Sequence, residues 1–203
     1  MSNYVHLDGK QIPLTDSQVE RIRTVIGRTI PLAGVAPGEI ARIGSREFVV
    51  LEHLEDGTTA LILKGLYGEH EYGNDNNFSE SEVQEACEEF LASLLEEGVA
   101  EGDIVEHEVD LTSLDGLKDY GTCRCKVSLL TMEQYRKYVE ILDRHKPEKW
   151  WWLVTPHSTD THGNGRWILC VSPSGYLNNY NYCNCGIGVR PFLIFNSSIF
   201  VSV

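Results

Sequence analysis

Residues 150–156 read WWWLVTP, and this stretch decides the fold that we expect for the second half of the chain. Tryptophan and β-branched residues favour extended structure, so the stretch predicts a β-strand. Successive side chains of a strand point to opposite faces, which puts Trp150 and Trp152 on one face and Trp151 on the other. We expect one face to be core and the other to line a binding surface, with Trp151 and Trp152 as structural residues.

The residues after this strand also favour β-structure. RWILCVSP (166–173) predicts a second strand, and Pro173-Ser174-Gly175 predicts a turn. The closing residues 188–203 are rich in β-branched and aromatic side chains, which indicates further strands. The C-terminal part should therefore form an antiparallel sheet.

Three residues at the start of the closing segment are assigned structural roles: Gly188, Arg190 and Pro191. Arg190 carries five N–H donors, which suits a buried guanidinium that ties loops together. Pro191 has no backbone N–H, so it predicts a sheet edge or a bulge.

Upstream, two β-rich runs flank Asp56-Gly57 and predict a hairpin over residues 47–64. The Asp-Gly dipeptide favours a type I′ turn, because both central residues of that turn need positive φ. The polar, glycine-containing stretch 67–78 predicts a surface loop. Shorter strands are expected at residues 104–109 and within CRCKVSLLT (123–131).

Three helices are predicted from pairs of residues with capping-box spacing. Thr15 and Gln18 precede a short helix over 16–26, and Thr131 and Gln134 precede the last helix. Ser79 and Glu82 form the box of a longer helix that ends at Gly98. Apolar residues then repeat at helical spacing. They are Val83, Ala86, Cys87, Phe90, Leu91, Leu94 and Leu95 in the long helix, and Tyr135, Val139 and Leu142 in the last one.

The order of elements predicts the fold class. A hairpin, a helix, a strand, a second helix and several strands indicate one α+β domain, which we place at residues 37–203. Residues 1–36 are expected to hold the short helix and a connector that is rich in proline and glycine. A chain of 203 residues has the length of one such domain with a short appendage.

Composition limits the partners. Seventeen basic and thirty acidic residues give a net charge of −13, which disfavours a nucleic-acid partner. No apolar run approaches the roughly 20 residues that span a bilayer, so we expect no membrane insertion. The N-terminus lacks the pattern of a signal peptide. We therefore expect synthesis in a reducing cytoplasm and mostly free thiols.

Several motifs in order resemble a family of uncharacterised phage and prophage proteins. They are FVVLEH (48–53), EEFLASLL (88–95), LLTMEQY (129–135), WWWLVTPHS (150–158), VSPSG (171–175) and GVRPF (188–192). That family is similar to C-type-lectin-like domains, in the branch of formylglycine-generating enzymes and phage receptor-binding variable proteins. The resemblance implies a C-type-lectin-like domain whose variable positions lie just before the closing strand.

The stretch YLNNYNYCNC (176–185) occupies that place here. Tyrosine offers a large contact surface with little loss of entropy, and asparagine both donates and accepts hydrogen bonds. A contact surface is one interpretation, and a polar edge strand is another. Because asparagine is a poor strand former, we expect an exposed, irregular segment. The loop HSTDTHGNG (157–165) has a similar composition.

Two Cys-x-Cys pairs raise a third interpretation, a metal or disulfide site. They are Cys123 with Cys125 and Cys183 with Cys185. Structural zinc usually takes cysteines two to four residues apart, so the signal is weak. No catalytic motif for hydrolysis, phosphate binding or a zinc protease occurs. We therefore expect no enzyme, no metal and no cofactor.

The prediction for function is non-covalent recognition of a protein or glycan ligand, such as a host-surface receptor. Two alternatives stay open: a structural virion or assembly protein, and a metal- or thiol-dependent enzyme of the formylglycine-generating type. Self-association is also left open. The predicted binding residues are His157, Thr159, Asp160, Asn164, Tyr176, Asn178, Asn179, Tyr180, Asn181, Tyr182 and Asn184.

Overall fold

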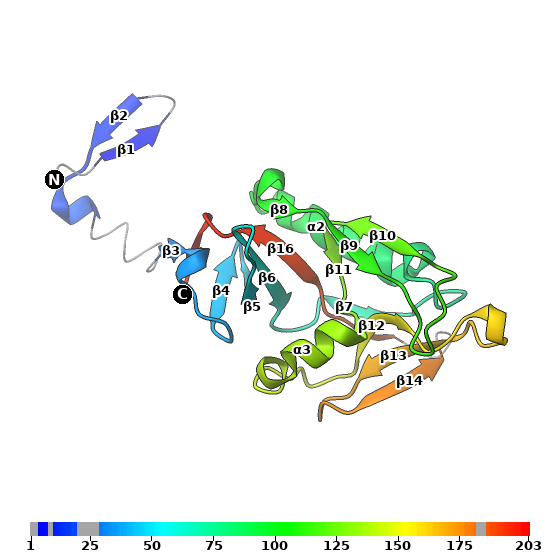
Figure 1. Cartoon of the computed structure of the whole chain (residues 1–203). Helices are drawn as coiled ribbons and strands as arrows, with labels where there is room; N and C mark the ends of the chain where they lie inside the picture. The colour runs from blue at the N-terminus through cyan, green and yellow to red at the C-terminus, as the bar shows by residue number, and fades with distance from the viewer. Residues whose placement is uncertain (1–3, 8–9, 20–28, 182–185) are drawn as a thin grey trace.

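The computed structural model of the protein describes residues 4–7, 10–19, 29–181 and 186–203. The fold is mixed α+β with much more strand than helix (Figure 1). The helices are α2 (Glu82–Glu96) and α3 (Met132–Leu142), with 3-10 turns η1 (Leu32–Gly34), η2 (Phe78–Glu80), η3 (Glu101–Asp103) and η4 (Asp160–His162). The strands are β1 (Tyr4–Leu7), β2 (Lys10–Pro13), β3 (Thr29–Pro31), β4 (Ile40–Ile43), β5 (Arg46–His53), β6 (Thr58–Leu63), β7 (Gly68–His70), β8 (Ile104–Val105), β9 (His107–Asp110), β10 (Thr122–Cys125), β11 (Val127–Ser128), β12 (Trp151–Pro156), β13 (Trp167–Val171), β14 (Leu177–Asn181), β15 (Ile187–Val189), β16 (Phe192–Asn196) and β17 (Phe200–Ser202).

Two large sheets form the body. One has eight strands in the order β11-β16-β6-β5-β4-β17-β3, with β8 also paired to β16, and the other has five in the order β14-β13-β12-β15-β7. Strand pairs are antiparallel except β12 with β15, which run parallel through Trp151 and Gly188. The expected C-terminal antiparallel sheet is therefore mixed. Only Arg190 and Pro191 separate β15 from β16, so the chain steps directly from one sheet into the other.

The central strands of both sheets, such as β6 and β12, are buried on both faces. Alternate residues of β5 and β12 enter two different cores: Phe48 and Trp152 join the core with α2, whereas Val49 and Trp151 join the core with α3. Trp150 is half-buried against the same core as Trp152, as the alternation predicted. The expected binding face on β12 is wrong, because Trp151 is as buried as Trp152. In Figure 1, α3 lies in front of the sheets.

The predicted hairpin is confirmed, but its turn is different. The Leu54 N–H donates to the Thr58 carbonyl, and the Gly57 N–H donates to the Leu54 carbonyl. The loop thus has three residues and ends at Gly57 with φ of 82°. This is the pattern in which a turn is followed by one left-handed residue, in place of the predicted two-residue type I′ turn. The Asp56 carboxylate accepts hydrogen bonds from the N–H and hydroxyl of Thr58.

The helix predictions hold with two corrections. The cap of α2 is Ser81, whose hydroxyl accepts from Gln84 N, and not Ser79, which lies in η2. The predicted capping box of α3 is present. Its buried stripe includes Tyr138, whereas Val139 is 36% exposed. The box of Thr15 and Gln18 also starts a helix at residue 16, whose predicted end lies outside the described residues.

Residues 67–78 are not a surface loop. They hold β7, whose backbone pairs with β15, and they bury Tyr72 and Phe78 completely. The ring of Tyr72 packs edge-on against Trp152, with centroids 5.4 Å apart. Their polar neighbours concealed these two core residues in the sequence.

Several short strands differ from the expectation. The predicted strand at 104–109 is two strands, because β8 pairs with β16 and β9 pairs with β10. The N-terminal region contains the paired strands β1 and β2, which were not predicted. Within the expected connector, β3 joins the eight-stranded sheet, and Leu32 and Val35 are part of the core.

The Asn- and Tyr-rich segment is also different from the expectation. Residues 177–181 form the regular strand β14, which pairs with β13 from Val171 to Trp167. The expectation of an irregular segment is therefore wrong over residues 177–181, and the alternative interpretation, a polar edge strand, is confirmed there. Residues 182–185, with Tyr182, Cys183, Asn184 and Cys185, lie outside the described residues.

Pro191 is neither at an edge nor in a bulge. It is buried between β15 and β16, and its carbonyl accepts from Leu63 N. Gly188 allows a close approach of two backbones: a Cβ there would lie 2.8 Å from the Trp150 carbonyl oxygen. This contact explains the glycine.

Candidate functional site

The loop of residues 157–165 was predicted to contact a ligand, but its side chains bond mainly to the neighbouring loop 111–121. The hydroxyl of Ser158 donates to Asp115 at 2.7 Å, and the ring Nδ1 of His162 lies 2.9 Å from the same oxygen. The hydroxyls of Thr159 and Thr161 both donate to Asp119. Two aspartates thus fasten the loop at four points.

These bonds explain the charge state of the two aspartates. Hydrogen bonds from Ser113, Ser158 and His162 lower the pKa of Asp115 well below its ordinary value. Donation from Thr159 and Thr161 lowers the pKa of Asp119. Hydroxyl donors stabilise the ionised carboxylate, so the fastening belongs to the charged form.

A buried asparagine fixes the same loop from the other side. The side chain of Asn76 is fully buried and donates to the carbonyls of Ser158 and Trp167, each at 2.8 Å. It accepts from the Tyr120 hydroxyl at 2.7 Å. Its backbone N–H donates to the Gly165 carbonyl at 3.0 Å.

The predicted loop residues divide accordingly. Thr159 is 1% exposed and turned inward, which corrects its assignment as a contact residue. His157 is half-buried, and its Nδ1 is enclosed without a hydrogen-bond partner in the described structure. Asn164 is half-buried, and its N–H donates to the Thr159 carbonyl. Asp160 is exposed, and its carboxylate accepts from Gly165 N at 3.2 Å.

Among the described residues, strand β14 is an edge strand of the five-stranded sheet and pairs with β13 alone. Tyr176, just before it, is 63% exposed, and Asn178 and Asn179 are half-buried. The Asn178 side chain accepts from Asn179 N at 2.9 Å and occupies one backbone donor. Tyr180 and Asn181 belong to the strand, but their side chains lie outside the described part. Of the predicted site residues whose side chains are described, Tyr176 at this edge and Asp160 in the loop are exposed.

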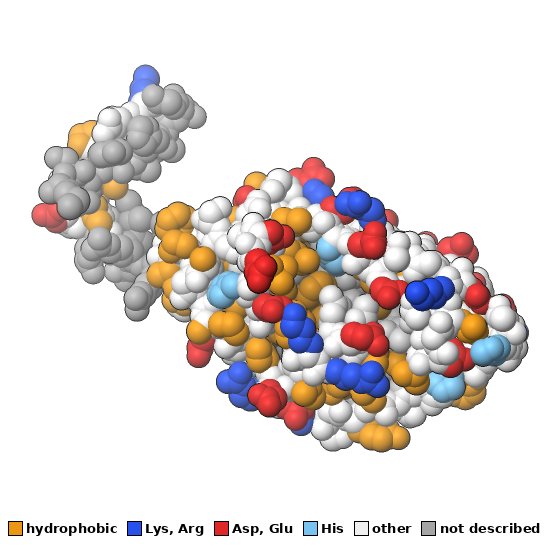
Figure 2. All heavy atoms as spheres, in the orientation of Figure 1, with side chains coloured by type: hydrophobic (Ala, Val, Ile, Leu, Met, Phe, Trp, Pro, Cys, Tyr) orange, Lys and Arg blue, Asp and Glu red, His pale blue; other side chains and the backbone are white. Residues whose placement is uncertain are grey.

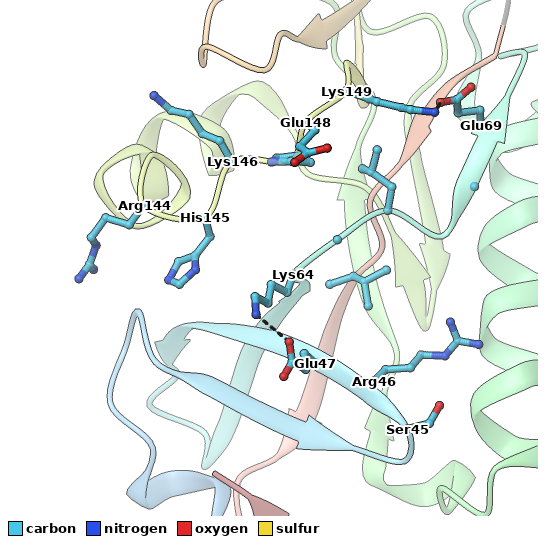
Figure 3. A pocket seen from close by; sticks show the side chains of 15 residues that line it. Ser45, Arg46, Glu47, Lys64, Glu69, Arg144, His145, Lys146, Glu148 and Lys149 are labelled. Carbon is cyan, nitrogen blue, oxygen red and sulfur yellow. Dashed lines mark hydrogen bonds and ion pairs between the residues drawn. The ribbon is translucent and has the colours of Figure 1, made fainter.

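A second candidate site was not predicted. A groove of about 1180 Å³ lies between three segments: residues 45–47 at the start of β5, residues 63–69 between β6 and β7, and residues 144–149 after α3 (Figure 3). Its apolar floor includes Leu63, Leu66 and Pro147. Concave sites of this size with a few polar groups are where proteins usually bind ligands.

Charge distinguishes this groove from the rest of the protein. Its lining has five basic residues, namely Arg46, Lys64, Arg144, Lys146 and Lys149, and three acidic ones, namely Glu47, Glu69 and Glu148. The whole chain has seventeen basic and thirty acidic residues. Over the face shown in Figure 2, acidic and basic side chains are interspersed. Arg46 pairs with Glu97 outside the lining, which leaves four basic residues against three acidic ones, and Lys146 pairs with Asp143 at 3.1 Å. The lining therefore has a small excess of basic residues on an acidic protein.

The ion pairs of the groove are exposed. Lys64 pairs with Glu47 at 2.7 Å, with the two side chains 46% and 32% exposed, and Lys149 pairs with Glu69. Figure 3 shows Arg46 directed away from the groove, and it pairs with Glu97, the residue that follows α2. Within the described part of the chain, the Arg144 guanidinium has no carboxylate partner and donates only to the Glu140 carbonyl. Exposed pairs are weak, so these cations can exchange partners.

Arg190 joins two walls of the groove from inside the fold. It is fully buried, as predicted, and donates to the carbonyls of Leu63, Lys64 and His145 at 2.9, 3.2 and 2.8 Å. Its guanidinium lies 5.2 Å from the Trp151 ring centroid. Burial lowers the pKa of Arg190 to about 10, so it remains charged at neutral pH.

Metal binding receives no support from the described residues. Among them, no three or more His, Cys, Asp or Glu side chains are placed to hold an ion. The thiols of Cys87, Cys123, Cys125 and Cys170 are free. Cys87 is fully buried on α2, as its packing role predicted.

Comparison with known proteins gives no family. No protein-family model matches the sequence, and neither a curated protein nor a solved structure is detectably similar to it. No helix in the described ranges is both long and apolar enough to cross a membrane.

Sequence reasoning missed the groove because its residues come from three distant segments. One signal was present: Arg144, Lys146 and Lys149 fall within six residues. Two acidic residues, Asp143 just before them and Glu148 among them, concealed the pattern. In the structure Asp143 is not a lining residue of the groove.

Proposed function

We propose that this protein acts by non-covalent recognition and that its ligand is an acidic, extended segment of a partner protein. The segment would bind in the groove between residues 45–47, 63–69 and 144–149, called the inter-sheet groove below. The observation that carries the proposal is the excess of basic over acidic residues around an open groove, on a chain with net charge −13. Complementary charge steers association and favours one class of partner over others. Apolar side chains on the floor supply contact area for an extended chain.

The groove residues favour binding over catalysis. The Ser45 hydroxyl donates to Glu97, whose pKa is lowered mainly by the hydrogen bond from the Ser45 backbone N–H, so this carboxylate is a weak base. A ring nitrogen of His145 contacts the Gly38 carbonyl and no nucleophile. The pKa of Glu47 is lowered by Lys64 and Arg42, which keeps it ionised rather than poised to donate a proton. A carboxyl group that acts as a general acid needs a pKa raised toward the working pH.

A matched set of peptides tests the proposal. We would measure fluorescence anisotropy with labelled octapeptides of alternating Glu and Leu, Gln and Leu, or Lys and Leu. The Glu-Leu peptide should bind, and added salt should weaken its binding because exposed charges are screened. The neutral and basic peptides should bind at least tenfold more weakly, which corresponds to about 1.4 kcal/mol.

Two variants locate the binding. Lys64→Glu with Lys149→Glu should weaken the Glu-Leu peptide about tenfold, since each exposed charge contributes up to about 1 kcal/mol. Arg136→Glu with Lys118→Glu, at two exposed positions outside the groove, makes the same charge change and should have little effect. Equal weakening by both variants would indicate general attraction and would contradict a groove site.

A second candidate surface is the edge strand β14. The specific observation is the exposed Tyr176 next to β14, which pairs only with β13 among the described strands and so offers an edge to which partner strands can add. Under this alternative, Tyr176→Ala abolishes capture of the natural partner, whereas the groove double variant retains it.

The domain family and the biological setting of the protein are also proposals. We propose a C-type-lectin-like domain of the phage receptor-binding type, supported by the ordered motifs from FVVLEH to GVRPF and by an α+β fold with two main helices. A host-surface receptor or a neighbouring virion subunit would then supply the acidic segment. Purification of the protein with phage particles would support this setting.

A further inference from the structure

The hairpin of β9 and β10 contains a pair of thiols that the proposed function does not use. Cys123 and Cys125 lie on the inner face of β10, whereas Thr122 and Arg124 on its other face are exposed. Both thiols are half-buried against the core that contains Cys87. Residues i and i+2 of a strand share a face, so their sulfurs are neighbours.

The two thiols have unequal chemistry. Contact with Cys125 lowers the pKa of Cys123, and the Ser79 hydroxyl adds to this effect against the opposing effect of burial. The same contact and burial raise the pKa of Cys125. Burial also raises the pKa of Cys87, which stays a protonated thiol. A thiolate is the reactive form of cysteine, so reactivity is concentrated at Cys123.

We propose that Cys123 and Cys125 form a peroxide-sensitive dithiol that closes to a disulfide. The Cys123 thiolate attacks hydrogen peroxide, the O–O bond breaks, and Cys123 becomes a sulfenic acid as one water leaves. The Cys125 sulfur then attacks the Cys123 sulfur, the S–O bond breaks, and a second water leaves. Two thiols are oxidised to one disulfide, and one peroxide is reduced to two waters.

Geometry makes this disulfide reversible. Two residues of extended strand span about 6.6 to 6.8 Å between Cα atoms, at the upper limit of what a disulfide bridges. A bond formed at that limit is strained, and strained disulfides are easily reduced. The strain is tolerable here because β10 pairs only with β9 in a two-stranded sheet, which can adjust without moving the large sheets.

The site is independent of the groove. Cys123 and Cys125 line no part of it, so failure of either proposal leaves the other standing. The loop between β9 and β10 carries Asp115 and Asp119, which fasten residues 157–165. Oxidation would therefore act on the loop that the sequence identified as a recognition surface.

Mass spectrometry of tryptic peptides from the full-length protein tests the proposal. Folded protein is treated with hydrogen peroxide, free thiols are alkylated after unfolding, and trypsin cleaves after Lys118, Arg124 and Lys126. The expected product holds residues 119–126 together, either linked across the cut at Arg124 or uncut and two hydrogen atoms lighter. Dithiothreitol followed by renewed digestion with trypsin should return it to the two separate peptides.

Controls separate this bond from other oxidation. Cys125→Ser should give no linked product and a Cys123 sulfenic acid that dimedone traps. Cys87 and Cys170 should be recovered unoxidised, because both are buried. The proposal is overturned if Cys123 is recovered as a free thiol, links to another peptide or another chain, or accumulates as sulfinic acid in the wild-type protein.

Discussion

The loop of residues 157–165 and the inter-sheet groove are both polar, yet they use their polar groups in opposite ways. In the loop, Ser158, Thr159 and Thr161 donate their hydroxyl protons to two aspartates of the same chain. In the groove, Lys64 and Lys149 make exposed pairs, and Arg144 has no carboxylate partner in the described structure. The loop has little hydrogen-bonding capacity left for a ligand, whereas the groove retains its charge.

This difference teaches that polar composition does not identify a binding surface. A serine or threonine that is bonded within the protein would have to break that bond to contact a ligand, which cancels most of the gain. An exposed ion pair holds its partners weakly and can give them up. The comparison predicts large stability effects where the chain is bonded internally and small ones at the exposed charges.

The largest effect is expected at Arg190, which is buried behind the walls of the groove. Arg190→Ala should lower the free energy of unfolding by about 3 kcal/mol or more, because three carbonyls lose their donor and a large buried side chain leaves a cavity. Arg190→Met fills much of that space and removes a buried charge, so it should cost less. Denaturant unfolding measures both. A loss below about 0.5 kcal/mol for Arg190→Ala would show that the walls are held by other contacts.

The next effect concerns the loop. Asn76→Ala should cost about 2 kcal/mol, because the carbonyls of Ser158 and Trp167 and the Tyr120 hydroxyl lose a buried partner. Asn74→Ala is a matched control two residues away, where the side chain is exposed, and it should change stability by no more than about 0.5 kcal/mol. Equal stability of the two variants would mean that the loop is not fastened through Asn76.

Acid should loosen the loop of residues 157–165 before it affects the contacts of the buried Arg190. The folded-state pKa values of Asp115 and Asp119 are lowered, so their contribution is complete above the unfolded value of about 4. It is lost as the pH falls below that value toward the folded pKa values. The protection of residues 158–162 against hydrogen exchange, taken relative to the intrinsic rate at each pH, should therefore fall below about pH 4. Asp115→Asn should accelerate this exchange at neutral pH and flatten its acid dependence, and an unchanged profile would contradict the assignment.

Sequence periodicity predicted the regular elements well. The capping box of Thr131 and Gln134 and the alternation of Trp150, Trp151 and Trp152 follow from local geometry, which the sequence contains directly. The burial of Arg190 also followed from the chemistry of its donors. These features depend on neighbours in the chain or on one side chain.

The errors share a different cause. Tyr72, Asn76 and Phe78 lie among polar residues, and only pairing with β15 and contact with loop 157–165 bring them inside. Strand β14 is rich in asparagine, and the ladder with β13 overrides that weak propensity. The groove unites residues up to about a hundred positions apart. Such features depend on pairing between distant residues, and the composition of a short stretch of sequence does not show which distant residues pair.

The smallest effect is expected at the exposed charges of the groove. Lys64→Gln removes the pair with Glu47 and should change the free energy of unfolding by less than about 1 kcal/mol, because both side chains are partly solvated. Lys149→Gln should behave alike at the pair with Glu69, and the double variant should be additive, since the pairs share no partner. Thermal or denaturant unfolding of the three variants checks this. A loss as large as that of Asn76→Ala would mean that the groove charges are bonded as firmly as the loop, and the contrast between the two regions would disappear.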